Sequence, residues 1–181
     1  RYLMAKILFL HPYAESDFGR QSIPLSLIFT LLKKNGHDCE LFDTTFLDNE
    51  ILRGERPNHD MELKKLKFFK NWDNNFFSKN KKGDITSLFQ SKIDQFKPDL
   101  ITFSFWGSHL HAEGEYFSYD NGLKIINNVK IDPKTKIIVG GTIPSSNPNE
   151  VLKKNPIINY VIKGKSELVY LDIVNALDQN K

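Results

Sequence analysis

Short apolar runs alternate with segments of helical periodicity along most of this chain. Runs of about four to eight apolar residues, rich in β-branched side chains and bounded by turn residues, are typical of strands buried on both faces of a sheet. Lys136–Val139 is the clearest run, because Gly140 and Gly141 follow it and allow positive φ or the close approach of a ligand. Comparable runs predict further strands at 5–10, 39–43, 99–105 and 159–162.

Between these runs, apolar residues recur at a spacing of roughly three to four positions, which places them on one face of a helix. Ile23, Leu27 and Leu31 mark such a face after the first run. Lys97–Pro98 ends a second helix, because the residue before proline avoids the α region. In all, helices are predicted at 22–36, 85–96, around 123–129, from Asn147 onward and from Ser166 to Leu177, with a long loop at 106–119.

Strands and helices therefore alternate, which predicts an α/β fold with a doubly wound, five-stranded parallel sheet of the flavodoxin-like or Rossmann-like kind. We expect the strand order 2-1-3-4-5, with helices on both faces. In such sheets, ligands bind at the carboxyl ends of the strands, where neighbouring strands send their helices to opposite faces. The loops 11–21, 104–119 and 140–147 are predicted to line this crevice, with Gly164–Ser166 at its far edge.

The segment 44–83 interrupts the alternation, and we interpret it as an insertion in a single domain that spans 1–181. Its lysines are interleaved with aromatic residues, among them Phe68, Phe69 and Trp72. Such a mixture can bind single-stranded nucleic acid through charge and stacking. The favoured interpretation is that the aromatic side chains pack on the domain or on a neighbour, because no nucleic-acid module surrounds them.

Composition narrows the class of protein only a little. The chain has 181 residues, 40% of them hydrophobic, and a net charge of +3, which does not by itself argue for nucleic acid. Its apolar runs are too short to cross a bilayer. A single cysteine, Cys39, excludes an internal disulfide framework and a cysteine-only metal site. A cytoplasmic protein without a membrane partner is expected.

Common catalytic and phosphate-binding motifs are missing from the predicted crevice. The first loop lacks the Gly-x-Gly-x-x-Gly fingerprint, and His11, Pro12 and Ser104 stand where a response-regulator receiver needs acids. His109 and His111, with Glu113 and Glu115 behind them, have a spacing that could hold a divalent metal ion. Exposed loop histidines are the favoured interpretation, because no third ligand is fixed by the sequence.

Several blocks, in order, resemble the B12-binding domain of cobalamin-dependent radical SAM enzymes. The blocks are 6–12 with 23–27 and 34–43, then 97–104, 138–145 with 148–152, and 160–167. Together they cover nearly the whole chain except the insertion. The resemblance implies a domain that binds cobalamin at residues which we take as its candidate site: His11, Pro12, Tyr13, Ser104, Phe105, Trp106, Gly140, Gly141, Thr142 and Gly164.

Two departures from the family accompany the resemblance. Ile143 stands where the family usually has histidine, and Gly164-Lys165-Ser166-Glu167 replaces its Gly-Glu-Gly-Glu turn. The Asp-x-His-x-x-Gly signature that supplies a lower axial histidine in other B12 proteins is absent as well. The resemblance therefore implies His-off cobalamin. His11 lies at a strand end that could challenge this expectation, but it lacks the flanking Asp and Gly.

Radical SAM chemistry needs a Cys-x-x-x-Cys-x-x-Cys cluster site, which one cysteine cannot provide. The resemblance therefore implies that the iron–sulfur cluster and SAM belong to a radical SAM barrel outside this chain, and that the chain is a non-catalytic fragment or a stand-alone domain. That barrel and a small-molecule substrate are the expected partners. Two alternatives stay open: a cofactor-free interaction or substrate-recognition module, and a small hydrolase or transferase that uses His11, His109 or His111.

Overall fold

The computed structural model describes residues 4–12, 23–44, 84–103 and 113–179, and for 113–118 and 178–179 the backbone only. The strands of this part of the chain are β1 (Lys6–His11), β2 (Asp38–Asp43), β3 (Leu100–Phe103), β4 (Lys136–Val139) and β5 (Tyr160–Val161). Its helices are α1 (Ile23–Lys34), α4 (Ile85–Phe96), α5 (Glu113–Asn127), α6 (Thr142–Ser146), α7 (Pro148–Lys154) and α8 (Glu167–Gln179).

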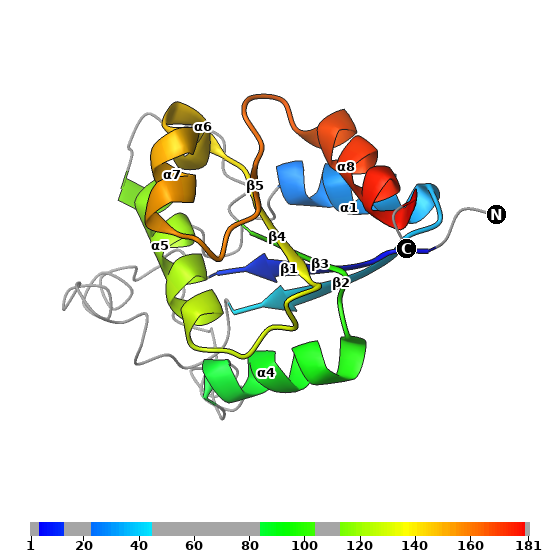
Figure 1. Ribbon diagram of the computed structural model, residues 1–181, viewed down its shortest axis with the longest axis horizontal. Coiled ribbons are helices and arrows are strands. Elements are labelled where there is room, and N and C mark those ends of the chain that lie inside the picture. Colours follow the sequence, from blue (N-terminus) through cyan, green and yellow to red (C-terminus); the bar gives the residue numbers. More distant parts are fainter. Residues whose placement is uncertain (1–3, 13–22, 45–83, 104–112, 180–181) are drawn as a thin grey trace, which may run out of the picture.

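The five strands form one parallel sheet in the order β2-β1-β3-β4-β5, as predicted (Figure 1). The strand order reverses its direction at β1, which pairs with β2 on one side and with β3 on the other. The fold class is therefore confirmed as a Rossmann-like or flavodoxin-like α/β sheet.

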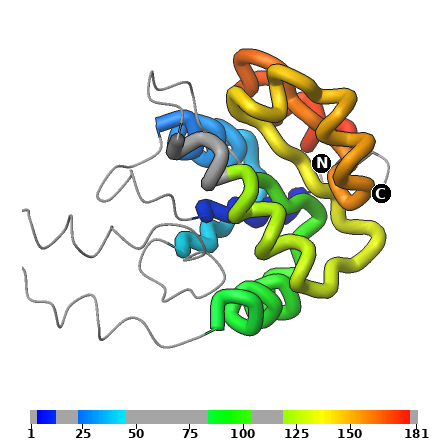
Figure 2. Tube along the Cα trace, turned by 90° about the vertical axis from the view of Figure 1, so that its left-hand side faces the viewer, coloured from blue at the N-terminus to red at the C-terminus, as the bar shows by residue number. Residues whose placement is uncertain are grey.

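Both faces of the sheet are buried. Successive side chains of a strand point to opposite faces, so the side chains of β1 enter two separate core clusters. Leu8 and Leu10 of β1 belong to a core cluster with α4, α5 and α7, whereas Ile7 and Phe9 belong to a second cluster with α1 and α8. Figure 1 shows α1 and α8 above the strands and α4 below them, and Figure 2 shows α4 (green) on the side away from α1 (blue). Helices thus cover both faces, which explains the near-continuous apolar strands.

Local capping signals set several helix boundaries. The Asp84 carboxylate accepts hydrogen bonds from the backbone N–H groups of Thr86 and Ser87 at the start of α4. At its end, Lys97 adopts the left-handed conformation, with φ 52°, and donates its N–H to the carbonyl of Ile93. The helix start predicted at Asn147 is confirmed: Asn147 is the N-cap of α7, and its side-chain oxygen accepts the N–H of Glu150.

Two boundaries differ from the predictions. α5 begins at Glu113, so the second half of the predicted loop 106–119 is helical, and the residues after Gly141 form the short helix α6 instead of a loop. The first part of α5 lacks an apolar stripe, and the helix contains Gly114 and Gly122, which sequence patterns treat as helix breakers. Gly122 is required by packing: a Cβ there would lie 2.3 Å from Cδ2 of Phe103.

The predicted insertion lies almost entirely outside the described residues. Thr44, its first residue, is buried and donates its N–H to the carbonyl of His11, and 45–83 are not described. None of the helices in the described part of the chain is long and apolar enough to cross a membrane.

Candidate functional site

The carboxyl ends of the strands meet at one edge of the sheet, because all the strands are parallel. β1 ends at His11, β3 at Phe103 and β4 at Val139, and β1 and β3 are neighbours. The helices that follow these two strands pack on opposite faces, α1 in one core cluster and α5 in the other. This edge is therefore the topological switch point at which α/β sheets bind ligands, and we call it the carboxyl edge.

His11 brings an imidazole to the middle of the carboxyl edge. It is half-buried and stands beside Asp43 in the register of β1 and β2. Burial lowers the pKa of the His11 imidazole, and the negative charge of Asp43 opposes this shift without cancelling it. The ring is therefore neutral at physiological pH and can either donate or accept a hydrogen bond. Pro12, the next residue, is buried.

The turn after β4 is shaped by glycine. Gly140 is buried, and Gly141 has φ 93° and ψ 179°, a backbone conformation that a side chain would strain. The exposed Thr142 then begins α6, and the carbonyl of Gly141 accepts the N–H of Ser145 at 3.1 Å. The predicted glycine turn is therefore present, and it leaves no side chain directly after the end of β4.

The turn after β5 lies next to the glycine turn. The N–H of Ile162 donates to the carbonyl of Val139 at 2.8 Å, which continues the pairing of β5 with β4. Gly164 has φ 80°, and a Cβ added there would meet no atom within 4 Å. Conformation, not crowding, therefore explains why a glycine is needed here, and the space in front of it is open.

One residue that connects the two turns was not singled out from the sequence. The Ser145 hydroxyl donates to the carbonyl of Ile162 at 3.2 Å and accepts the N–H of Gly164 at 3.3 Å. Nothing in the residue pattern distinguishes Ser145 from its neighbour Ser146, whose hydroxyl bonds only within its own helix, to the carbonyl of Ile143. The connection is visible only once β4 and β5 lie side by side.

Four predicted site residues, Tyr13, Ser104, Phe105 and Trp106, lie outside the described residues. The same holds for His109 and His111 of the alternative metal site, and the side chains of Glu113 and Glu115 are not described. Within the described ranges, no cluster of three or more His, Cys, Asp or Glu residues could hold a metal ion. His11, Pro12, Gly140, Gly141, Thr142 and Gly164 are therefore the candidate residues whose positions are known.

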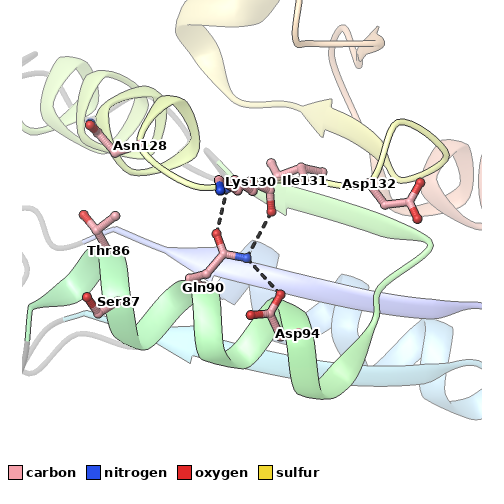
Figure 3. Close-up of a pocket in the computed structure, with 8 residues that line it drawn as sticks. All are labelled: Thr86, Ser87, Gln90, Asp94, Asn128, Lys130, Ile131 and Asp132. Atoms are coloured by element: carbon pink, nitrogen blue, oxygen red, sulfur yellow. Dashed lines mark hydrogen bonds between the residues drawn. The ribbon is translucent and has the colours of Figure 1, made fainter.

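A hollow of about 770 Å³ lies away from the candidate residues, between α4 and the segment 128–132 (Figure 3). Gln90 bridges it: the amide nitrogen donates to the carbonyl of Lys130 and to the carboxylate of Asp94, and its oxygen accepts the N–H of Lys130. These bonds give Gln90 a structural role, because they fasten the connection between α5 and β4 to α4.

The described residues of the carboxyl edge place few side chains in front of the strands. Gly140 and Gly141 place no Cβ beyond β4, and Gly164 leaves open space beyond β5. His11 and Pro12 provide a neutral, partly apolar surface beyond β1. Fold and edge together define a Rossmann-like domain whose candidate site, in the described part of the chain, is formed mainly by backbone.

Comparison with known proteins agrees with this class. No family model and no curated protein matches the chain. Among solved structures, the chain is similar to the radical S-adenosylmethionine methyltransferase TsrM from Kitasatospora setae with tryptophan substrate and the SAM analogue aza-SAM bound. The TM-score is 0.57 and the identity 12%, over 98% of this chain and 26% of that one.

TsrM with cobalamin and a [4Fe-4S] cluster bound gives a TM-score of 0.55 at 13% identity, over 99% of this chain and 25% of that one. The chain thus spans about a quarter of TsrM. At such low identity the similarity establishes the fold, and at that level it confirms the resemblance to cobalamin-dependent radical SAM enzymes.

Proposed function

We propose that this chain is a cobalamin-binding domain that presents methylcobalamin to a radical SAM domain for methyl transfer. The observation that carries the proposal is the open, glycine-formed carboxyl edge, in a fold that is shared with a cobalamin-bound structure. Neither part would suffice alone, because Rossmann-like sheets bind many ligands and a pair of glycine turns is common.

The described residues have distinct parts in this proposal. Gly140 and Gly141 allow the cofactor to approach the end of β4, and Gly164 does the same beyond β5. Backbone N–H groups after these glycines provide donors for the polar groups of the corrinoid periphery. When bound, cobalamin supplies the methyl group through its cobalt–carbon bond, so the protein contributes binding and orientation. The proposed site is completed by four residues outside the described ranges: Tyr13, Ser104, Phe105 and Trp106.

The proposed state of the cofactor is His-off. His11 is the candidate side chain that could challenge it, because its ring is neutral and a neutral imidazole is a good metal ligand. Its sequence neighbours do not reproduce the Asp-x-His-x-x-Gly signature. The absorbance spectrum of the complex distinguishes a histidine-ligated cobalt from one without histidine.

The remaining parts of the proposed enzyme lie outside this chain. A radical SAM barrel with its iron–sulfur cluster would activate a small-molecule acceptor, and the pair would work in the cytoplasm. The chain spans about a quarter of TsrM, which leaves room in a longer enzyme for such a domain. By itself the chain is then a binding domain without catalytic activity.

The test is an absorbance titration of the purified chain with hydroxocobalamin, followed by gel filtration. We expect the corrinoid to co-elute in stoichiometric amount with a spectrum that lacks histidine ligation. A histidine-ligated spectrum would keep the domain but assign His11 to the cobalt. Failure to co-elute at about tens of micromolar would reject cobalamin binding by this chain.

Two glycine variants make the titration specific for the carboxyl edge. Gly141 and Gly36 have similar positive φ angles, 93° and 87°, but Gly36 precedes β2 at the opposite edge of the sheet. Gly141→Ala and Gly36→Ala each place a side chain at a positive φ, so Gly36→Ala controls for backbone strain away from the carboxyl edge, and thermal unfolding checks that both variants are folded. Only Gly141→Ala should weaken binding of hydroxocobalamin. Equal binding by both variants would place the ligand elsewhere.

One observation favours the alternative of a cofactor-free interaction module. Ile143, at the position where the resembling family usually carries histidine, is partly buried and packs against the core cluster of α4, α5 and α7. An apolar anchor at this position is what a domain without a cofactor would keep. Absence of corrinoid binding in both the chain and its complex with a radical SAM barrel would support this alternative.

A further inference from the structure

Ser145 links two parts of the carboxyl edge that are separate in the sequence. It lies in α6, directly after the glycine turn, and its own N–H donates to the carbonyl of Gly141. Its hydroxyl donates to the carbonyl of Ile162 and accepts the N–H of Gly164. Both functions of the hydroxyl, donor and acceptor, are thus used on the backbone of the turn after β5.

This link matters because β5 is weakly fixed at its carboxyl end. The strand has only two residues, and it pairs with β4 through Ile138↔Tyr160 and Val139↔Val161. One further backbone bond follows, from the N–H of Ile162 to Val139. Beyond that point, among the described residues, the hydroxyl of Ser145 is what joins the turn at Gly164 to the rest of the edge.

We infer that Ser145 is a positioning residue, whose hydroxyl holds the turn after β5 against the glycine turn after β4. Gly141 and Gly164 then form one rim of the ligand site, which is ordered before the ligand binds. The inference rests on the proposed function for the identity of that ligand, a cobalamin. A rim that is already ordered costs less conformational entropy when the ligand binds. The hydroxyl acts through the two turns and needs no contact with the cofactor.

Three variants of the full chain separate this role from a general effect on folding. Ser145→Ala removes both bonds, and Ser145→Thr keeps the hydroxyl. Ser146→Ala is the matched control, because it removes a hydroxyl from the neighbouring position whose bond, to the carbonyl of Ile143, stays within α6. Thermal unfolding of each variant, followed by circular dichroism, confirms that it is folded.

The first readout, without cofactor, is hydrogen exchange of the Gly164 amide measured by NMR. We expect about tenfold faster exchange in Ser145→Ala, because a hydrogen bond of ordinary strength is lost. The second readout is the dissociation constant for hydroxocobalamin, which should rise about tenfold in the same variant. Ser145→Thr should restore both values, and Ser146→Ala should leave both at the wild-type level.

The outcomes distinguish a failure of this inference from a failure of the proposed function. If the wild-type chain binds hydroxocobalamin and Ser145→Ala binds it equally well, Ser145 is not a positioning residue. If the wild-type chain does not bind it, the proposed function fails, and the exchange of Gly164 alone tests the link between the turns. Unchanged exchange in Ser145→Ala overturns the link in either case.

Discussion

The hydrogen bond between Tyr170 and Thr102 joins the last helix to the central strand of the sheet. The two hydroxyl oxygens are 2.7 Å apart, and either group can donate. Both side chains are fully buried, at 0% exposure. Burial raises the pKa of the Tyr170 phenol, so the hydroxyl stays protonated over the whole range in which the protein is studied. The pair therefore stays hydrogen-bonded in a place that water does not reach.

Removing one partner should cost more than removing both. Tyr170→Phe leaves the Thr102 hydroxyl without this partner, and a buried unsatisfied hydroxyl costs about 1–3 kcal/mol of the free energy of unfolding. Thr102→Val removes the other hydroxyl with little change of shape and should also lower the free energy of unfolding. The double variant loses the bond but leaves neither hydroxyl behind, so its cost should be no larger than that of either single variant.

Urea unfolding of the four proteins measures this difference. At a slope of about 2 kcal/mol per molar urea, a loss of about 2 kcal/mol lowers the midpoint by roughly 1 M. Because the double variant should cost no more than either single variant, the coupling energy of the double-mutant cycle should be at least as large as the effect of Tyr170→Phe, about 1–3 kcal/mol. If the two single effects simply add in the double variant, the two hydroxyls are not energetically coupled, and another interaction must hold α8 on β3.

Three further predictions follow from buried groups. Gly122→Ala should lower the free energy of unfolding by about 1–3 kcal/mol in urea titrations, because its Cβ would overlap the fully buried ring of Phe103; an unchanged midpoint would show that the ring can move. Burial lowers the pKa of His11, so the unfolded state binds protons more readily than the folded state. The free energy of unfolding should therefore fall as the pH drops through about 6.5. If His11→Gln does not flatten this dependence of the free energy of unfolding on pH, other groups cause it. Burial raises the pKa of Cys39 to about 12, so iodoacetamide at mildly alkaline pH should label the thiol only after unfolding, and rapid labelling of the folded chain would contradict its burial.

The fold could be predicted because its strands carry an unambiguous signal. Buried parallel strands are apolar on both faces, and the runs ending at Leu10 and Val139 have this character in full. The turns after β4 and β5 could be predicted from their glycines. Gly141 and Gly164 have positive φ angles, which glycine adopts readily whatever residues surround it. The strand order followed from the alternation of strands and helices, which is typical of doubly wound sheets of the flavodoxin-like kind.

Other features could not be predicted, because they depend on contacts between distant segments. Gly122 is a helix residue because α5 approaches β3 closely at Phe103, and this is known only after packing. The functions of Ser145 and Tyr170 likewise depend on partners that are 17 and 68 positions away. Polar residues give no periodic signal of their own, so patterns of hydrophobicity cannot identify such pairs.

Ile143 shows how a departure from the resembling family can leave the carboxyl edge intact. Its side chain is partly buried against the core cluster of α4, α5 and α7, so its replacement of a histidine changes packing beneath α6. The edge itself carries the backbone of Gly141 and Gly164, and both glycines have positive φ angles in this chain. Lys165 is exposed beside Gly164. An edge formed mainly by backbone depends less on the identity of its side chains than an edge formed by side chains, so these two departures do not argue against the proposed function.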